Sequence, residues 1–172
     1  WTGTSITLPT PTKTGYTFGG WYSDSGLTKK VGDGGSSYTP TSSLTLYAKW
    51  TINSYNVIYD YKTNGGTTAT KTTATVNYGS SIDLSPTATK AGWTFVGWNT
   101  NKDATVGLTS LNMSTSNVTL YAIYRKEAVT LTAKFNGNGA TLSATSNLTC
   151  TLPAVYNNAS QQASCTVTAP TI

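Results

Sequence analysis

Two cysteines are the side chains of this chain best suited to covalent chemistry. Cys150 and Cys165 are separated by 14 residues in a polar context. This spacing suits a disulfide in an exported protein better than a catalytic or metal-binding thiol, and two unrelated free thiols are the alternative. Asn157 and Asn158 lie midway between the cysteines and suit a tight turn. A hairpin folded there would place the cysteines opposite each other, so we predict a cross-strand Cys150–Cys165 bond.

The acidic side chains are dispersed and do not predict an active site. No pair stands at a spacing that repeats, as a glycosidase dyad would suggest. The chain has no histidine, which removes the commonest general base and metal ligand. Residues 34–37, Gly-Gly-Ser-Ser, lack the lysine of a phosphate-binding loop. We therefore expect no enzyme, no cofactor and no metal. The acids are Asp24, Asp33, Asp60, Asp83, Asp103 and Glu127.

The basic side chains are scattered as well. Eleven Lys and Arg against six Asp and Glu give a formal charge of +5, but the longest basic runs are the pairs 29–30 and 125–126. A nucleic-acid footprint needs a cluster, so no nucleic-acid partner is expected. The segment has no run of 18 apolar residues, and we expect no membrane span within it.

Internal repetition is the strongest pattern in the sequence. Residues 15–21, Gly-Tyr-Thr-Phe-Gly-Gly-Trp, recur 77 positions later as residues 92–98, Gly-Trp-Thr-Phe-Val-Gly-Trp. Residues 44–50, Leu-Thr-Leu-Tyr-Ala-Lys-Trp, recur 74 positions later as residues 118–124. Two separate motifs that recur in the same order predict a tandem-repeat architecture.

The repeats divide the chain into three parts. An opening pattern, with Val57, Tyr59 and Tyr61, recurs 74 positions later from Leu131. We predict the C-terminal part of a first repeat at 1–50, a complete repeat at 55–127, and the N-terminal part of a third at 129–172, which carries an insertion. Both ends of the chain are thus expected to fall inside repeats, so the working unit is the array.

Thr, Ser, Asn and Gly favour strands and turns, so a mainly β fold is expected. In the complete repeat, residues 57–61 and 73–77 alternate around Asn64-Gly65-Gly66, which predicts a β-hairpin. A further strand is predicted at 81–84. Apolar residues at roughly helical spacing predict one short helix within 101–117.

This order of motifs resembles the Listeria–Bacteroides repeat, also called the internalin B-type repeat, over nearly the whole chain. The resemblance implies small β-grasp-like modules, α+β with at most one short helix each, strung along secreted or wall-attached bacterial surface proteins. Two features depart from it: charged residues are few, and the third copy carries the insertion.

Aromatic and aliphatic residues of the motifs are predicted to fill the core of each module, because a small domain needs large side chains there. The alternative is an aromatic platform for sugars, with Trp1, Tyr38 and Tyr156 as the candidates outside the motifs. The predicted repeat core is Tyr16, Phe18, Trp21, Leu46, Trp50, Trp93, Phe95, Trp98, Leu120 and Tyr124.

Three functional hypotheses follow. The first is a structural or adhesive repeat segment of an extracellular bacterial cell-surface or fibre protein, acting as stalk or spacer, whose partners are neighbouring repeats of the same or an adjacent chain. The second is a module that binds carbohydrate or a host receptor. The third is an isopeptide-crosslinked pilin domain, for which Lys134 and Asn136 are the candidates.

Overall fold

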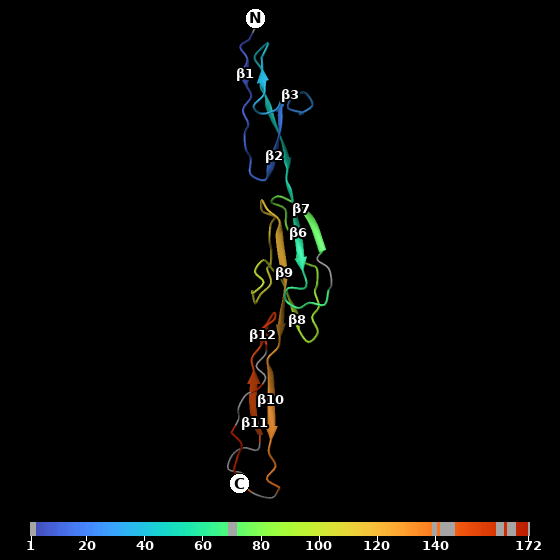
Figure 1. Cartoon of the computed structure of the whole chain (residues 1–172), viewed down its shortest axis with the longest axis vertical. Helices are drawn as coiled ribbons and strands as arrows, with labels where there is room; N and C mark the ends of the chain where they lie inside the picture. Colours follow the sequence, from blue (N-terminus) through green and yellow to red (C-terminus); the bar gives the residue numbers. More distant parts are fainter. Residues whose placement is uncertain are drawn as a thin grey trace. The chain divides into compact units, whose positions relative to one another are not determined.

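The computed structural model describes residues 3–68, 72–138, 141, 147–160, 164 and 168–171 (Figure 1). Every regular element among these residues is a β-strand, and the strands form several small sheets. The expected mainly β fold of small modules is therefore confirmed. The chain divides into two compact units: Trp1–Val57 with Ala74–Ile82 and Ser110–Val118 as unit 1, and Ile58–Thr73 with Asp83–Thr109 and Thr119–Ile172 as unit 2.

Five strands of the first repeat lie in unit 1. Three of them form a sheet of order β3-β2-β5, and the other two, β1 and β4, pair with each other. Strand β2 is antiparallel to both of its neighbours. The strands are β1 (Ile6–Thr7), β2 (Tyr16–Tyr22), β3 (Lys30–Gly32), β4 (Ser37–Tyr38) and β5 (Tyr47–Ile52).

A five-stranded sheet combines the strands of the complete repeat with one strand that follows this repeat in the chain. Its order is β12-β9-β6-β7, and β8 pairs with β9 as well. Strands β10 and β11 form a separate two-stranded ribbon in unit 2. The strands are β6 (Ser54–Asp60), β7 (Thr72–Asn77), β8 (Thr94–Asn99), β9 (Val118–Lys126), β10 (Val129–Lys134), β11 (Asn147–Leu152) and β12 (Val155–Tyr156).

Strands β6 and β7 are neighbours in the sheet, as the predicted hairpin requires. Side-chain hydrogen bonds join Ser54 to Asn77 at 2.6 Å and Thr75 to Asn56 at 3.2 Å, which is the pairing of an antiparallel hairpin. The alternation of apolar and polar residues that predicted this hairpin therefore corresponds to strands whose side chains point alternately to the two faces of the sheet.

The short helix predicted within residues 101–117 is wrong. The N–H of Leu108 donates to the Trp98 carbonyl at 2.7 Å, and the N–H of Met113 donates to the Ser80 carbonyl at 2.9 Å. These bonds go to other segments, whereas a helix would direct each N–H to the residue four positions earlier. The segment is a loop in which tertiary hydrogen bonds replace the helical ones.

The strand predicted at residues 81–84 is also wrong. Only Ser81 forms an isolated bridge, to Asn112. The Asp83 carboxylate accepts a hydrogen bond of 2.9 Å from the Ser85 N–H. A side chain that bonds its own backbone two residues on competes with strand pairing, and here it ends the extended segment.

Candidate functional site

The first aromatic motif forms a compact cluster between β2 and β5. Phe18 lies opposite Trp50 in the antiparallel register, and their ring centroids are 5.4 Å apart. Phe18 also meets Trp21 edge to face at 5.6 Å. The Trp21 indole N–H donates a 2.8 Å hydrogen bond to the Pro9 carbonyl. Edge-to-face packing and a satisfied indole N–H are typical of core aromatic residues.

The second motif has the same arrangement between β8 and β9. Phe95 lies opposite Tyr124 at 6.0 Å and meets Trp98 edge to face at 5.5 Å. The Trp98 indole N–H donates a 2.6 Å hydrogen bond to the Pro86 carbonyl. In both copies the register shifts between the Phe and the Trp. Such a bulge lets two residues three positions apart pack together.

Burial distinguishes the two tryptophans. Trp98 is only 1% exposed, because Tyr61 and Tyr59 of the hairpin pack edge to face against it at 4.9 Å and 5.2 Å. Trp21 is half-buried, and its aromatic contact among the described residues is Phe18. The hairpin therefore completes the core of the central repeat.

All ten predicted core positions lie among the described residues. None of them is exposed. Tyr38 and Tyr156 are half-buried, and Trp1 lies outside the described residues. Leu120, Tyr124 and Trp98 are buried, whereas Tyr16, Phe18, Trp21, Leu46, Trp50, Trp93 and Phe95 are half-buried.

A single residue, Asn53, connects β5 to β6. Its N–H donates to the Gly15 carbonyl at 2.9 Å, and its carbonyl accepts from the Tyr78 N–H at 2.8 Å. The Thr17 hydroxyl donates to the Asn53 side chain at 2.6 Å. Gly15 has φ +77°, and a Cβ there would lie 2.0 Å from the Tyr78 ring, so only glycine fits this contact. The first connection between repeats is thus hydrogen-bonded on both sides.

The second connection is made by strand β12, which the sequence did not predict. Val155 pairs with Lys126 and Tyr156 pairs with Arg125, so β12 adds to the edge of β9. The turn that follows is closed by a 3.0 Å hydrogen bond from the Ala159 N–H to the Tyr156 carbonyl. A segment that the sequence analysis assigned to a third repeat therefore extends the sheet of the central repeat.

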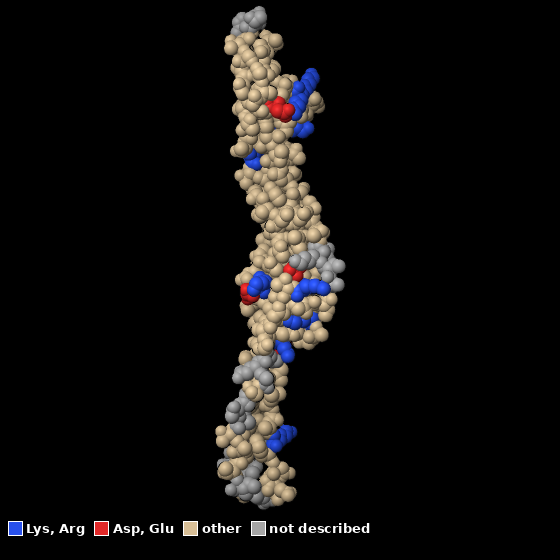
Figure 2. All heavy atoms as spheres, viewed as in Figure 1, with Lys and Arg blue, Asp and Glu red and all other residues tan. Residues whose placement is uncertain are grey.

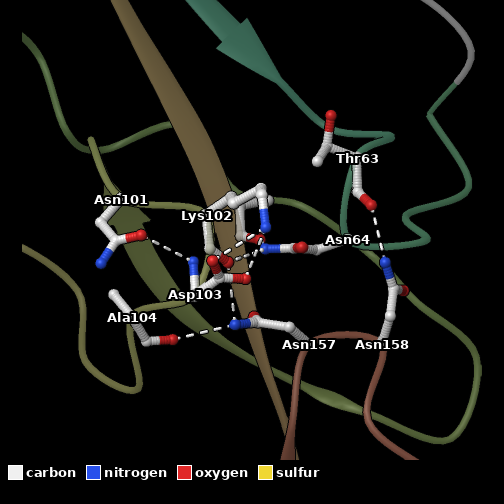
Figure 3. Close-up of polar contacts among 9 residues, drawn as sticks. Thr63, Asn64, Asn101, Lys102, Asp103, Ala104, Asn157 and Asn158 are labelled. Carbon is white, nitrogen blue, oxygen red and sulfur yellow. Dashed lines mark hydrogen bonds and ion pairs between the residues drawn. The ribbon is translucent and has the colours of Figure 1, made fainter.

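Asn157 joins this segment to the loop 101–104 through side-chain hydrogen bonds (Figure 3). It is 7% exposed and has φ 56°, a conformation that asparagine tolerates. Its side-chain nitrogen donates to the carbonyls of Lys102 at 3.0 Å and Ala104 at 2.9 Å, and its Oδ1 accepts from the Tyr124 N–H at 3.1 Å. Its own N–H donates to the Tyr124 carbonyl at 2.8 Å. Both the nitrogen and the oxygen of the buried Asn157 side chain therefore have hydrogen-bond partners.

Asn64 reaches the same loop from the hairpin turn. Its side-chain nitrogen donates to the carbonyls of Lys102 at 2.9 Å and Ala122 at 3.0 Å, and the residue is 4% exposed. Figure 3 shows both amide nitrogens directed at the Lys102 backbone. We call Asn64, Asn157 and the loop 101–104 the asparagine cluster. The sequence placed Asn64 and Asn157 at predicted turns. It did not reveal the carbonyls that their side chains bond, which lie 38 to 58 residues away in the chain.

A concavity of about 590 Å³ lies beside the asparagine cluster. The exposed ion pair of Lys102 with Asp103, at 2.8 Å, stands on its rim. The concavity has one carboxylate in its lining among the described residues, that of Asp103, and no cysteine. It is lined by Thr63, Asn64, Lys102, Asp103, Val155, Tyr156, Asn157, Asn158 and Ala159.

Lys90 packs on the same region. Its Nζ lies 3.8 Å from the centroid of the Trp93 ring and donates a hydrogen bond to the Asn157 carbonyl. Partial burial lowers the pKa of Lys90 below its ordinary value. In the first repeat, Lys13 lies over Tyr16 at 4.0 Å, so the cation–π contact occurs in both copies.

Cys150 lies on β11 opposite Leu131 of β10. It is half-buried, on the same strand face as Leu148 and Leu152. Cys165 lies outside the described residues, so the Cys150–Cys165 disulfide stays a prediction. Lys134 and Asn136, the isopeptide candidates, are both exposed, whereas such a cross-link needs them buried together.

The charged side chains form no continuous patch on the face drawn in Figure 2, where Lys and Arg stand in separate small groups. Ion pairs such as Lys30 with Asp33 at 2.7 Å are exposed and add little stability. Within the described ranges, no three His, Cys, Asp or Glu residues gather as metal ligands would. The same residues include no helix long and apolar enough to span a membrane.

Comparison with known proteins gives consistent matches. The chain is 37% identical over 142 residues to internalin H of Listeria monocytogenes. The alignment covers 75% of this chain and 24% of that protein. The chain is also 36% identical over 137 residues to a putative membrane protein of Evansella cellulosilytica, covering 77% of this chain and 19% of that protein. The chain thus spans about a quarter or less of these relatives. No solved structure matches it.

The model of one family matches the chain twice. The matched residues are 2–49 and 55–123, which include Phe18, Trp21, Phe95 and Trp98 and end one residue before Trp50 and Tyr124. The resemblance found in the sequence is therefore confirmed. The chain belongs to the Listeria–Bacteroides repeat domain family, a repeat module of surface proteins.

Proposed function

We propose that this chain is a structural or adhesive repeat segment that acts as a stalk or spacer in an extracellular bacterial cell-surface or fibre protein. The observation that carries the proposal is the connection at Asn53, a single residue whose backbone bonds both repeats. A short connection that is hydrogen-bonded to both repeats limits the movement of one repeat relative to the next, as a spacer requires. The internalin relative and the repeat family support the surface setting.

The division at 1–50, 55–127 and 129–172 belongs to this proposal, as does the absence of enzymatic activity. The aromatic residues of the motifs stabilise the modules and are not arranged for chemistry. The segment needs no cofactor, and its partners are neighbouring repeats of the same or an adjacent chain.

The test is the relative motion of the first two repeats, measured by backbone NMR relaxation. We expect the wild-type repeats to tumble with one correlation time and a Gly-Gly-Ser insertion after Asn53 to separate their correlation times. The control is the same insertion after Gly35, an exposed turn position where an added Cβ would meet nothing within 4 Å. Independent tumbling of the wild-type repeats would refute the spacer role.

A carbohydrate- or host-receptor-binding role is the second candidate. The concavity beside the asparagine cluster favours it, because Tyr156 and polar side chains line an opening of about 590 Å³. However, the amide nitrogens of Asn64 and Asn157 are already committed to backbone carbonyls. Saturable binding of the isolated chain to a glycan array or to host cells, lost in Asn158→Ala, would favour this role over the spacer.

A further inference from the structure

A turn of the form Lys-x-Gly-aromatic leads into the phenylalanine-bearing strand of each aromatic cluster. It lies at residues 13–16 and 90–93, next to the start of β2 and of β8. In both copies the N–H of the aromatic residue donates to the lysine carbonyl at 3.0 Å, and the lysine Nζ lies over the aromatic ring. Gly15 has φ +77° and Gly92 has φ +74°, a backbone conformation that glycine adopts readily. We call each of these segments the lysine–glycine turn.

The lysine–glycine turn of the first repeat contacts Tyr78, which comes directly after β7. Gly15 is buried, and a Cβ added to it would lie 2.0 Å from the Tyr78 ring. The ring of Tyr16 meets the Tyr78 ring edge to face, with centroids 6.3 Å apart. The glycine and the aromatic residue of this turn therefore form a surface that fits a tyrosine ring.

The second repeat holds Tyr78 in position. The N–H of the next residue, Gly79, donates to the Met113 carbonyl at 2.9 Å, and the Ser80 N–H donates to the Asn77 carbonyl at 3.0 Å. Both bonds join the residues that follow Tyr78 to other parts of the second repeat. The second repeat thus presents the ring, and the first repeat receives it.

The lysine–glycine turn of the second repeat contacts residues that come directly after β12. Lys90 is half-buried, and its Nζ donates to the Asn157 carbonyl and lies 3.4 Å from the Asn158 Oδ1. Gly92 is exposed, and a Cβ added to it would meet no atom of the described residues within 4 Å. The same turn therefore contacts a following segment in both repeats, through its glycine in the first and through its lysine in the second.

We propose that the lysine–glycine turn is the site at which each repeat binds the chain segment that follows it. The glycine selects an aromatic ring, because a side chain at Gly15 would occupy the space of the Tyr78 ring. The lysine selects amide oxygens, because its ammonium forms charge-assisted hydrogen bonds with them. The inference deepens the proposed spacer role and rests on it, since a spacer needs consecutive segments to be held together.

The first test is backbone NMR relaxation of the full chain, which reports the correlation times of the first two repeats. We expect Gly15→Ala to give the two repeats separate correlation times, because the added methyl group displaces the Tyr78 ring. Gly92→Ala is the matched control, since it places alanine at the same positive φ but meets no described atom, and it should leave the wild-type result unchanged. Tyr78→Ala should also separate the repeats, whereas Tyr78→Phe, which keeps the ring, should not.

Tyr78→Ala keeps the test decisive if Gly15→Ala disturbs the folding of the first repeat, because it removes atoms and introduces no clash. A single correlation time in both Gly15→Ala and Tyr78→Ala would overturn the inference and leave the spacer role intact. Separate correlation times in Gly92→Ala would also overturn it, because strain in the turn of the second repeat would then be sufficient. Independent tumbling of the wild-type repeats would refute the spacer role and the inference with it.

The second test is hydrogen exchange at the Asn157 amide, whose N–H donates to the Tyr124 carbonyl. We expect Lys90→Met to speed this exchange, because the Asn157 carbonyl loses its ammonium donor. Lys13→Met is the matched control, since it removes the equivalent cation–π contact from the first repeat and should leave the Asn157 amide unchanged. Unchanged exchange in Lys90→Met would overturn the proposal that the turn recurs as a binding site.

Discussion

Replacing Trp98 with alanine removes the largest buried side chain of the central repeat. Trp98 is 1% exposed, and its ring centroid lies 4.9 to 5.5 Å from those of Phe95, Tyr59 and Tyr61. Truncation of a buried tryptophan costs about 3–5 kcal/mol of unfolding free energy, through lost transfer energy and the cavity left behind. We therefore expect Trp98→Ala to destabilise the central repeat by about this amount.

Trp21→Ala is the matched variant, because Trp21 has the same Phe and proline-carbonyl partners but is half-buried. Its cost should be roughly half as large, in proportion to the apolar area it buries. Trp98→Phe isolates the hydrogen bond to Pro86. It keeps an aromatic ring but leaves the carbonyl without the indole N–H, at a cost of about 1–3 kcal/mol.

The assay is urea unfolding followed by far-UV circular dichroism, with each variant's transition normalised to its own folded and unfolded baselines. Trp98→Ala should shift the transition of the central repeat to lower urea. A cost below about 1 kcal/mol for Trp98→Ala would refute a core role for the motif. Equal costs for Trp98→Ala and Trp21→Ala would refute the view that the hairpin makes the difference.

Three further predictions concern the connections, the cysteines and pH. Asn157→Ala should remove the side-chain donor to the Ala104 carbonyl and the acceptor of the Tyr124 N–H, at a cost of about 1–3 kcal/mol. It should therefore speed hydrogen exchange at the Tyr124 amide, whereas exposed Asn158→Ala should not change that amide. The Cys150–Cys165 bond should add about 3 kcal/mol by closing its loop, and free thiols in the unreduced exported protein would disprove it. The pKa of Asp24 lies below its ordinary value, because the Thr28 hydroxyl and the Lys29 N–H donate to its carboxylate. Its contribution to stability is therefore present above the unfolded-state pKa and lost as pH falls through the folded-state pKa, and NMR titration of Asp24 in folded protein should show the lowered midpoint.

The recurring motifs determined the local structure of the two aromatic clusters. The spacing of Phe and Trp around a glycine encodes a strand with a bulge, and alternation along residues 118–124 encodes the buried strand that faces it. Alternation around Asn64-Gly65-Gly66 likewise encoded the neighbouring strands β6 and β7. These features are set by nearby residues, and a repeat shows each of them twice, so they can be read without the fold.

Longer-range contacts decided the rest. Residues 101–117 have apolar residues at helical spacing, but Gly107 lies against the backbone of Gly97, where a Cβ would come within 2.8 Å of its Cα. That crossing holds the segment as a loop. The buried Asn157 side chain depends on carbonyls 53 and 55 residues away, and strand β12 depends on its pairing with the end of β9. A sequence pattern reports which face of an element is apolar, whereas the partner that covers this face, or bonds a buried amide, is fixed only when distant segments pack together.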